Sequence, residues 1–279
     1  MNYTKNLKNI IKSALKEDIG RMDITTEKII PANKSVKATI LAKENCVVCG
    51  LNVVSLVFMA QDKNIKFKPM VEEGAFVKKG KIIAHIYGKT RSILTAERVA
   101  LNFLSFLSGI STETRKFVDA VRPYKVKIMD TRKTIPGLRL LEKYAVRMGG
   151  AFNHRMRLDE MLLIKDNHLK VIKNYKALKG LLRKAKKYKV ELEVKNLKEF
   201  KEALKLQPDI IMLDNMSIKN IRKAVQIRNK LAHKAPKIEA SGGIMLKNVK
   251  RIASCKVDMI SIGALTHSVN SVDISLEIH

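Results

Sequence analysis

Residues able to do chemistry stand at the ends of six short apolar segments in the second half of the chain. Each segment ends in, or is followed by, a polar residue or a glycine: Asp130–Lys133, Lys165–His168, Glu191 with Glu193, Asp214 with Asn215, Glu239 with Ser241–Gly243, and Ser261 with Gly263. Barrel enzymes gather their catalytic groups at the carboxyl ends of parallel strands. One such residue needs no function, because strand ends reach solvent, but a full set of them indicates an active site.

These side chains form a cationic and an acidic group. The acidic group is Glu193 and Asp214, and the cationic group is Arg132, Lys133, His154, Arg155 and Lys165. Arginine binds carboxylates through paired hydrogen bonds and lysine acts as a point charge, so the cationic group suits a small polycarboxylate or a phosphate. The two carboxylates offer the oxygen ligands that Mg2+ prefers. The alternative for this pair is salt bridging to neighbouring lysines.

Two glycine turns follow the last two apolar segments. Ser241-Gly242-Gly243 precedes an amphipathic stretch, and Ser261-Ile262-Gly263 repeats the arrangement one segment later. Glycines let a backbone approach an anion, and the start of a helix offers free N–H groups. The last strands of barrels often bind phosphate in this way, so we expect a phosphate at these turns.

From Lys125 onward, short apolar segments alternate with amphipathic helices. The predicted strands are Val126–Asp130, Met161–Lys165, Val190–Val194, Ile210–Leu213, Ile238–Ala240 and Met259–Ile262, and the predicted helices start near Pro136, Asn174, Leu197, Ser217 and Met245. Strand–helix alternation implies parallel strands with right-handed crossovers. The fold class is therefore α/β, with an open or incomplete (β/α) barrel.

The first part of the chain predicts a different, α+β domain. An apolar stripe from Leu7 to Leu15 and the stretch Asn52–Gln61 predict helices, and Ser35–Gly50 predicts strand. Glycine turns near Gly74 and Gly80 resemble, in shape, the hammerhead or barrel-sandwich of biotinyl and lipoyl carriers. Two further helices are predicted over Thr95–Leu107 and Ser111–Arg122. We expect an N-terminal domain over residues 1–109 and a barrel over 110–279, whose C-terminal tail packs back on the first domain.

The net charge of +29, from 55 Lys and Arg against 26 Asp and Glu, admits two partners. One is a nucleic acid, bound through counterion release. The other is an anionic small molecule within a basic surface. The densest basic run, Lys173–Lys189, keeps apolar residues at helical spacing, and no nucleic-acid motif occurs. We therefore expect no nucleic-acid partner.

We expect neither a membrane protein nor a protein stabilised by disulfide bonds. The longest apolar runs, such as Val53–Ala60, are too short to cross a bilayer, and the first residues lack the pattern of a secretory signal. These two features predict a cytoplasmic protein without a membrane partner. Three cysteines argue against a disulfide scaffold. Cys46 and Cys49 lack a second zinc-ligand pair, so they are predicted to be small buried residues near a strand end.

The stretch Asp130–Arg155 resembles the signature of the quinolinate phosphoribosyltransferase family. Leu163–His168, Glu191–Val194, Met212–Asn215, Ala240–Ile244 and Ser261–His267 match in the same order, and Leu15–Gly20 and Asp23–Thr26 also fit. The resemblance implies that quinolinate and phosphoribosyl pyrophosphate give nicotinate mononucleotide, pyrophosphate and carbon dioxide in de novo NAD biosynthesis. It also implies Mg2+, no redox cofactor, and a homodimer or trimer of dimers. The molybdenum-utilisation branch shares part of these motifs and stays an alternative.

The same resemblance implies a role for each site residue. Quinolinate is bound by Arg132, His154, Arg155 and Lys165, and the phosphoribosyl substrate contacts Lys133 and Lys165. The ribose hydroxyls of that substrate and Mg2+ are bound by Glu193 and Asp214. Its 5-phosphate is bound by Ser241, Gly242, Gly243 and Gly263. Thr131 and Ser261 complete the substrate-binding set, and Arg98 reaches the neighbouring subunit's site. The catalytic residues are Lys133, Lys165, Glu193 and Asp214. His168 and His267 are expected in the scaffold. Met22, Ala151 and Arg157 replace glycines usual in the family.

Overall fold

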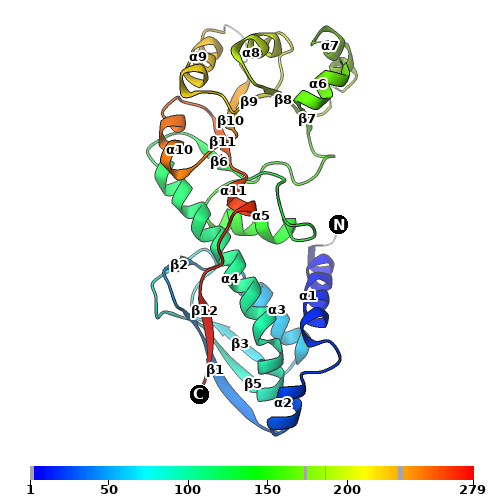
Figure 1. Ribbon diagram of the computed structural model, residues 1–279, viewed down its shortest axis with the longest axis vertical. Coiled ribbons are helices and arrows are strands. Elements are labelled where there is room, and N and C mark those ends of the chain that lie inside the picture. The colour runs from blue at the N-terminus through cyan, green and yellow to red at the C-terminus, as the bar shows by residue number, and fades with distance from the viewer. Residues whose placement is uncertain (1–2, 173–174, 186, 232–234) are drawn as a thin grey trace. The chain divides into compact units, whose positions relative to one another are not determined.

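The computed structural model describes residues 3–172, 175–185, 187–231 and 235–279, and it divides into two compact units (Figure 1). The first unit runs up to Arg115 and includes Ile135–Gly150 and Ser268–His279. The second unit comprises Lys116–Thr134 and Ala151–His267. One helix continues through residue 109, and Ile135–Gly150 joins the first unit, so the grouping is not a single division at that point. The C-terminal tail joins the first unit, as we expected.

The first unit is built on a four-stranded antiparallel sheet in the order β12-β1-β5-β3. These strands are β1 (Ser35–Ala42), β3 (Lys66–Pro69), β5 (Ile82–Lys89) and β12 (Ile274–Ile278), and β2 (Cys46–Val47) pairs separately with β4 (Phe76–Val77). The C-terminal strand β12 pairs with β1 from Ala38 to Ala42, so the tail of the chain completes the first unit.

Five helices belong wholly or largely to this unit: α1 (Tyr3–Ile19), α2 (Ile24–Ile29), α3 (Leu51–Gln61), α4 (Thr90–Val121) and α5 (Arg139–Met148). Helix α2 begins at a side-chain cap, since Asp23 Oδ1 accepts a hydrogen bond from Thr26 N at 2.9 Å. Helix α1 keeps Leu7, Ile11 and Leu15 buried, as the apolar stripe predicted.

Helix α4 is one helix where two were predicted. Gly109, which we expected to end the domain, lies within it, and a Cβ there would collide with the carbonyl oxygen of Asn270. The glycine therefore serves a close approach of the tail and not a break in the helix. Among the described residues, α4 alone is long and apolar enough to cross a membrane, contrary to our expectation. Its Ile93, Leu104 and Ile110 are fully buried, which is the pattern of a core helix.

The second unit is a six-stranded parallel sheet in the order β6-β11-β10-β9-β8-β7. Its strands are β6 (Lys127–Met129), β7 (Leu162–Ile164), β8 (Val190–Val194), β9 (Ile210–Asp214), β10 (Lys237–Ser241) and β11 (Met259–Ser261). Consecutive strands from β7 to β11 are neighbours, β11 returns to β6, and β6 and β7 form the two edges. The predicted fold class, an incomplete barrel beside an α+β domain, is confirmed.

Helices alternate with these strands: α6 (Asp166–Ile172), α7 (Tyr175–Lys184), α8 (Leu197–Leu204), α9 (Ile218–Asn229), α10 (Leu246–Ala253) and α11 (Ala264–His267). Local caps start two of them, because Asn196 Oδ1 accepts from Glu199 N at 2.9 Å and Ser217 Oγ from Asn220 N at 3.3 Å. Within the predicted basic run, α7 buries Leu178, while Lys173, Asn174 and Lys186 lie outside the described residues.

The strand register places the polar residues on one face at one end of the sheet. Ser241 is aligned with Asp214 on one side and with Ser261 on the other. Two residues before Asp214, Met212 is aligned with both Glu193 and Glu239. Aligned residues of parallel neighbours point to the same face, and the side chains of each strand alternate between faces. All five polar side chains therefore belong to the same face of the sheet.

The three cysteines are free and buried, as predicted for core residues. Cys46 belongs to β2, and Cys49 precedes α3 by two positions. Burial raises the pKa of Cys46 to about 11 and that of Cys49 still further. Such thiols are poor nucleophiles and poor metal ligands near neutral pH.

Candidate active site

The loop after β6 is tied to the segment that carries His154 and Arg155. Met129 forms a parallel bridge with Phe152. The buried Asp130 then accepts hydrogen bonds at both oxygens, from Asn153 Nδ2 at 2.6 Å and from His154 N at 2.8 Å. Asp130 was noted in the sequence only as a strand-end residue, but its contacts show that it holds the two cationic segments together.

The charges of two guanidinium groups act on each other in this region. Burial lowers the pKa of Arg155, and the charge of Arg132 lowers it further. Arg155 Nη1 donates to Met161 O at 2.8 Å, which fixes one end of its guanidinium. Because two like charges held together attract an anion, the pair suits a substrate with two carboxylates.

The predicted acidic pair lies beside Lys165. Lys165 Nζ is 3.6 Å from Glu193 Oε2, and the Glu193 side chain is only 10% exposed. Burial raises the pKa of Glu193; the charge of Asp214 adds to this effect, and Lys165 opposes it. The backbone N–H of Lys165 donates to His168 Nδ1 at 3.0 Å, which fits the scaffold role expected for that histidine.

The first glycine turn is shaped by a close approach to Asn215. Gly242 has a φ of +86°, and a Cβ on it would lie 2.5 Å from Asn215 Cγ. Asn215 in turn donates from its amide nitrogen to Asp214 Oδ1 at 3.0 Å and from its backbone nitrogen to Ser241 O at 2.9 Å. Strands β9 and β10 are thereby joined just beyond their ends, where Asp214 and the turn meet.

The side chain of Lys133 lies against the second glycine turn. A Cβ on Gly263 would lie 3.0 Å from Lys133 Cδ and 3.0 Å from the His267 ring. Thr266 Oγ1 also donates to Lys133 O at 2.6 Å. Lys133, from the first strand end, is therefore brought to the last strand end, and Ser261 lies buried there as the final residue of β11.

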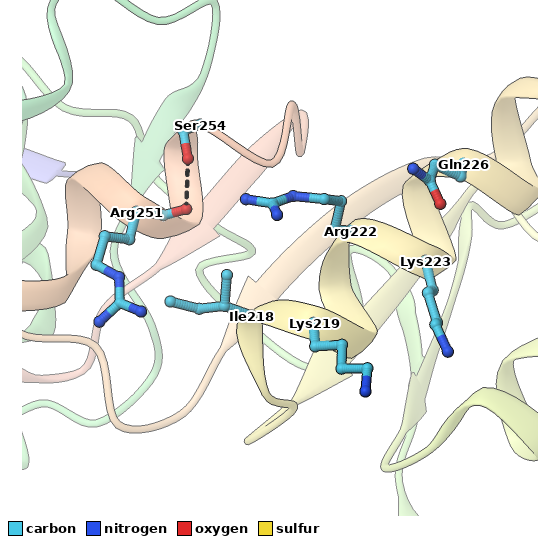
Figure 2. Close-up of a pocket in the computed structure, with 7 residues that line it drawn as sticks. All are labelled: Ile218, Lys219, Arg222, Lys223, Gln226, Arg251 and Ser254. Atoms are coloured by element: carbon cyan, nitrogen blue, oxygen red, sulfur yellow. Dashed lines mark hydrogen bonds between the residues drawn. The ribbon is translucent and has the colours of Figure 1, made fainter.

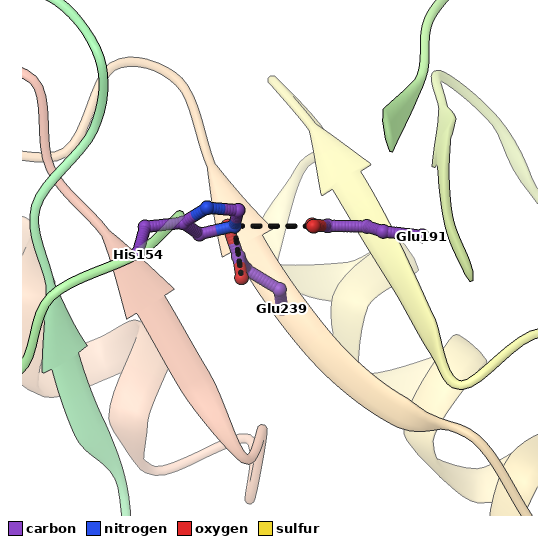
Figure 3. A group of neighbouring side chains, drawn as sticks. All are labelled: His154, Glu191 and Glu239. Atoms are coloured by element: carbon purple, nitrogen blue, oxygen red, sulfur yellow. Dashed lines mark ion pairs between the residues drawn. The ribbon is translucent and has the colours of Figure 1, made fainter. Parts of the chain in front are cut away.

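A buried cluster joins His154 to two carboxylates (Figure 3). His154 Nε2 is 3.1 Å from Glu191 Oε2 and 3.5 Å from Glu239 Oε2, and both glutamate side chains are fully buried. Burial lowers the pKa of His154, but the hydrogen bonds and charges of the two glutamates outweigh it and raise the pKa to about 9. Burial raises the pKa of Glu191, and Glu239 adds to this effect.

Sequence reasoning noted Glu191 and Glu239 near strand ends without assigning them a role. A usable signal was present, because each is a charged residue flanked by apolar residues inside a buried parallel strand. Both ring nitrogens of His154 have partners within the protein. The backbone N–H of Arg155 donates to Nδ1 at 2.8 Å, and Nε2 lies against Glu191.

Several other residues named from the sequence lie apart from these contacts. Arg98 is exposed on α4 in the first unit, and its role toward a neighbouring subunit stays a prediction. Among the departures from the family pattern, Met22 is 49% exposed and Ala151 is buried. Arg157 Nε donates to Asp159 Oδ1 at 3.0 Å on an exposed turn, so that contact accounts for its charge.

A separate hollow of about 490 Å³ lies between α9 and α10 (Figure 2). Its cations are Lys219, Arg222, Lys223 and Arg251, and none of the described residues that line it is a carboxylate. It contains none of the strand-end residues. Its described lining therefore lacks the combination of cations and carboxylates found at the strand ends.

The fold and the strand-end groups define a class of enzyme: an open α/β barrel that binds strongly anionic substrates beside a pair of carboxylates. Comparison with known proteins gives the family. The quinolinate phosphoribosyl transferase N-terminal domain matches residues 23–108, and the C-terminal domain of the same family matches residues 110–277. The chain belongs to the quinolinate phosphoribosyltransferase family.

Individual relatives are similar over almost their whole length. A probable nicotinate-nucleotide pyrophosphorylase (carboxylating) of Methanocaldococcus jannaschii is 44% identical, over 96% of each chain. The nicotinate-nucleotide pyrophosphorylase (carboxylating) of Mycobacterium leprae is 39% identical, over 97% of this chain and 96% of its own. The crystal structure of NadC from Streptococcus pyogenes superposes with a TM-score of 0.94 at 37% identity, covering 100% of this chain and 98% of its own.

Proposed function

We propose that the chain transfers the phosphoribosyl group of phosphoribosyl pyrophosphate to quinolinate, giving nicotinate mononucleotide, pyrophosphate and carbon dioxide in de novo NAD biosynthesis. The observation that carries this function is the pairing of cations with carboxylates at one end of the parallel sheet, in a chain of this family. The activity is that of a glycosyltransferase that also removes a carboxylate.

Quinolinate is assigned to the cationic end of the site. Arg132 and Arg155 bind its two carboxylates, and Thr131, His154 and Lys165 line the same position. The proximity of the two guanidiniums supports this assignment, because a dianion offsets their repulsion.

Phosphoribosyl pyrophosphate is assigned to the glycine turns and the carboxylates. Ser241, Gly242 and Gly243, with Ser261 and Gly263, hold its 5-phosphate, and Lys133 and Lys165 bind its negative charge. The left-handed backbone of Gly242 and Gly243 supports a cradle of N–H groups there. Glu193 and Asp214 accept hydrogen bonds from the ribose hydroxyls.

The reaction then proceeds by displacement and decarboxylation. The ring nitrogen of quinolinate forms a bond to the anomeric carbon, and the bond from that carbon to the pyrophosphate oxygen breaks. Glu193 and Asp214 stabilise the positive charge that develops on the sugar. The alkylated ring then accepts the electron pair left by departing carbon dioxide, and a proton replaces the lost carboxyl carbon. Orientation and exclusion of water are what the protein supplies for this second step.

We assign Mg2+ to Glu193 and Asp214. The donor set fits, because two neighbouring carboxylates supply hard oxygen ligands and the charge of Asp214 raises the pKa of Glu193. These two carboxylates would hold the ion, and its charge would offset the negative charge of the pyrophosphate leaving group.

The protein is proposed to act as a homodimer or a trimer of dimers in the cytoplasm. Arg98 is exposed on α4, so it is available to a second copy of the chain. Mixing an Arg98→Ala variant with an inactive Lys165→Ala variant tests this arrangement. Hybrid dimers regain part of the activity if Arg98 acts across subunits; no recovery would contradict a shared site.

The decisive experiment is purified protein with quinolinate, phosphoribosyl pyrophosphate and Mg2+, with nicotinate mononucleotide measured by chromatography. Turnover of quinolinate separates this function from that of the molybdenum-utilisation branch. The nucleic-acid alternative predicts tight binding to DNA or RNA with a steep salt dependence. Absence of mononucleotide together with such binding would overturn the proposed function.

A further inference from the structure

The cluster of His154, Glu191 and Glu239 has a geometry that the substrate contacts do not explain. Both glutamates project from interior strands of the sheet, Glu191 from β8 and Glu239 from β10, and both are fully buried (Figure 3). Burying two carboxylates is costly unless each has a polar partner. The one partner that the two share is His154 Nε2, at 3.1 Å and 3.5 Å.

Three such side chains could also hold a metal ion, since their ligand atoms lie within 4.8 Å of one another. The histidine argues against a metal. A metal-bound histidine normally donates a hydrogen bond from its other ring nitrogen. Here Nδ1 accepts one instead, from the backbone N–H of Arg155 at 2.8 Å. The backbone contact therefore leaves Nε2 as the ring nitrogen that faces the two carboxylates.

We propose that Glu191 and Glu239 are positioning residues, which hold His154 so that the adjoining Arg155 is placed for the carboxylates of quinolinate. His154 is then an anchor of this segment. The inference rests on the proposed function.

Contacts on both sides of His154 support this role. Its own backbone N–H donates to Asp130, and the backbone N–H of Arg155 donates to its ring. The segment is thus fixed to the end of β6 by its backbone and to β8 and β10 by its side chain. The charge of Arg155 also acts directly on Glu191, so the buried carboxylate offsets the repulsion between Arg155 and Arg132.

The test compares Glu191→Gln and Glu239→Gln with the wild-type enzyme in steady-state kinetics. Glutamine keeps the shape but removes the charge and can turn its amide group. We expect the KM for quinolinate to rise about ten-fold in each variant, with the KM for phosphoribosyl pyrophosphate within about two-fold. A merely structural role would lower kcat through loss of folded enzyme and leave both KM values unchanged. Glu202→Gln, an exposed carboxylate on α8, is the matched control.

A double-mutant cycle tests whether the glutamates act through His154. If they do, then His154→Ala combined with Glu191→Gln raises the KM for quinolinate no further than His154→Ala alone. Multiplicative effects would overturn the proposal, as would an unchanged KM for quinolinate in both glutamine variants. A stoichiometric metal in the wild-type enzyme that is lost in Glu239→Gln would also overturn it. Failure of the wild-type enzyme to use quinolinate would instead overturn the proposed function and this inference with it.

Discussion

Replacing Gly242 by alanine tests the glycine turn that we assign to the 5-phosphate. Two separate effects are expected. The residue has a φ of +86°, and an L-residue in the left-handed region costs about 1–2 kcal/mol. The new Cβ would also lie 2.5 Å from Asn215 Cγ, so the asparagine must move.

The movement of Asn215 reaches Asp214. Its amide nitrogen donates to Asp214 Oδ1 at 3.0 Å, and a hydrogen bond to a charged group contributes about 1.5–3 kcal/mol. If the misplaced carboxylate loses a comparable contact with the ribose, the KM for phosphoribosyl pyrophosphate rises about ten- to hundred-fold. The KM for quinolinate is expected to stay within about two-fold.

Gly80→Ala supplies the matched control. Gly80 has a φ of +85°, but no atom lies within 4 Å of its added Cβ, and it belongs to the first unit. Gly80→Ala should therefore lose about 1–2 kcal/mol of unfolding free energy in urea titrations, and Gly242→Ala should lose more, because its Cβ also displaces Asn215. Only Gly242→Ala should change the KM. Equal KM values for the two variants would refute the link from Gly242 through Asn215 to Asp214.

Three further predictions concern single groups. Lys165→Ala is expected to lower kcat/KM by at least about 100-fold with unchanged circular dichroism, because it removes a cation beside Glu193; a near-normal rate would contradict its catalytic role. Burial raises the pKa of Glu142 to about 7 from 4.5, so the native state holds an extra proton and the unfolding free energy should fall as pH rises between these values. Glu142→Gln should flatten that slope, and an identical slope would show the assignment to be wrong. Thiol reagents at pH 8 are expected to label the cysteines only on unfolding, since burial raises their pKa; rapid native labelling would argue for local opening.

The parallel strands could be predicted closely because each is a short apolar run between polar turns. The strand at Val190–Val194 was predicted to the residue, and each of the others differs by one residue at one or both ends. Their alternating side chains then put the strand-end residues on one face without any knowledge of distant contacts. That is why the candidate site could be assembled from local patterns.

Helix α4 shows where local patterns fail. A glycine inside a helix lowers helix stability, so Gly109 was interpreted as an end. In the structure the missing Cβ makes room for the backbone of Asn270, which is 161 positions away in the sequence. Strand β12 was not predicted as a strand either, because its role depends on pairing with β1.

The sequence by itself therefore determined the class of fold, the six parallel strands and the chemical types at their ends, because these follow from hydrophobic period and turn chemistry along the chain. Only the tertiary structure decided which groups meet. It joined Lys133 to Gly263, Lys165 to Glu193, and His154 to Glu191 and Glu239. These pairs come from separate strands and loops, and their distances depend on strand order and register, which no local pattern encodes.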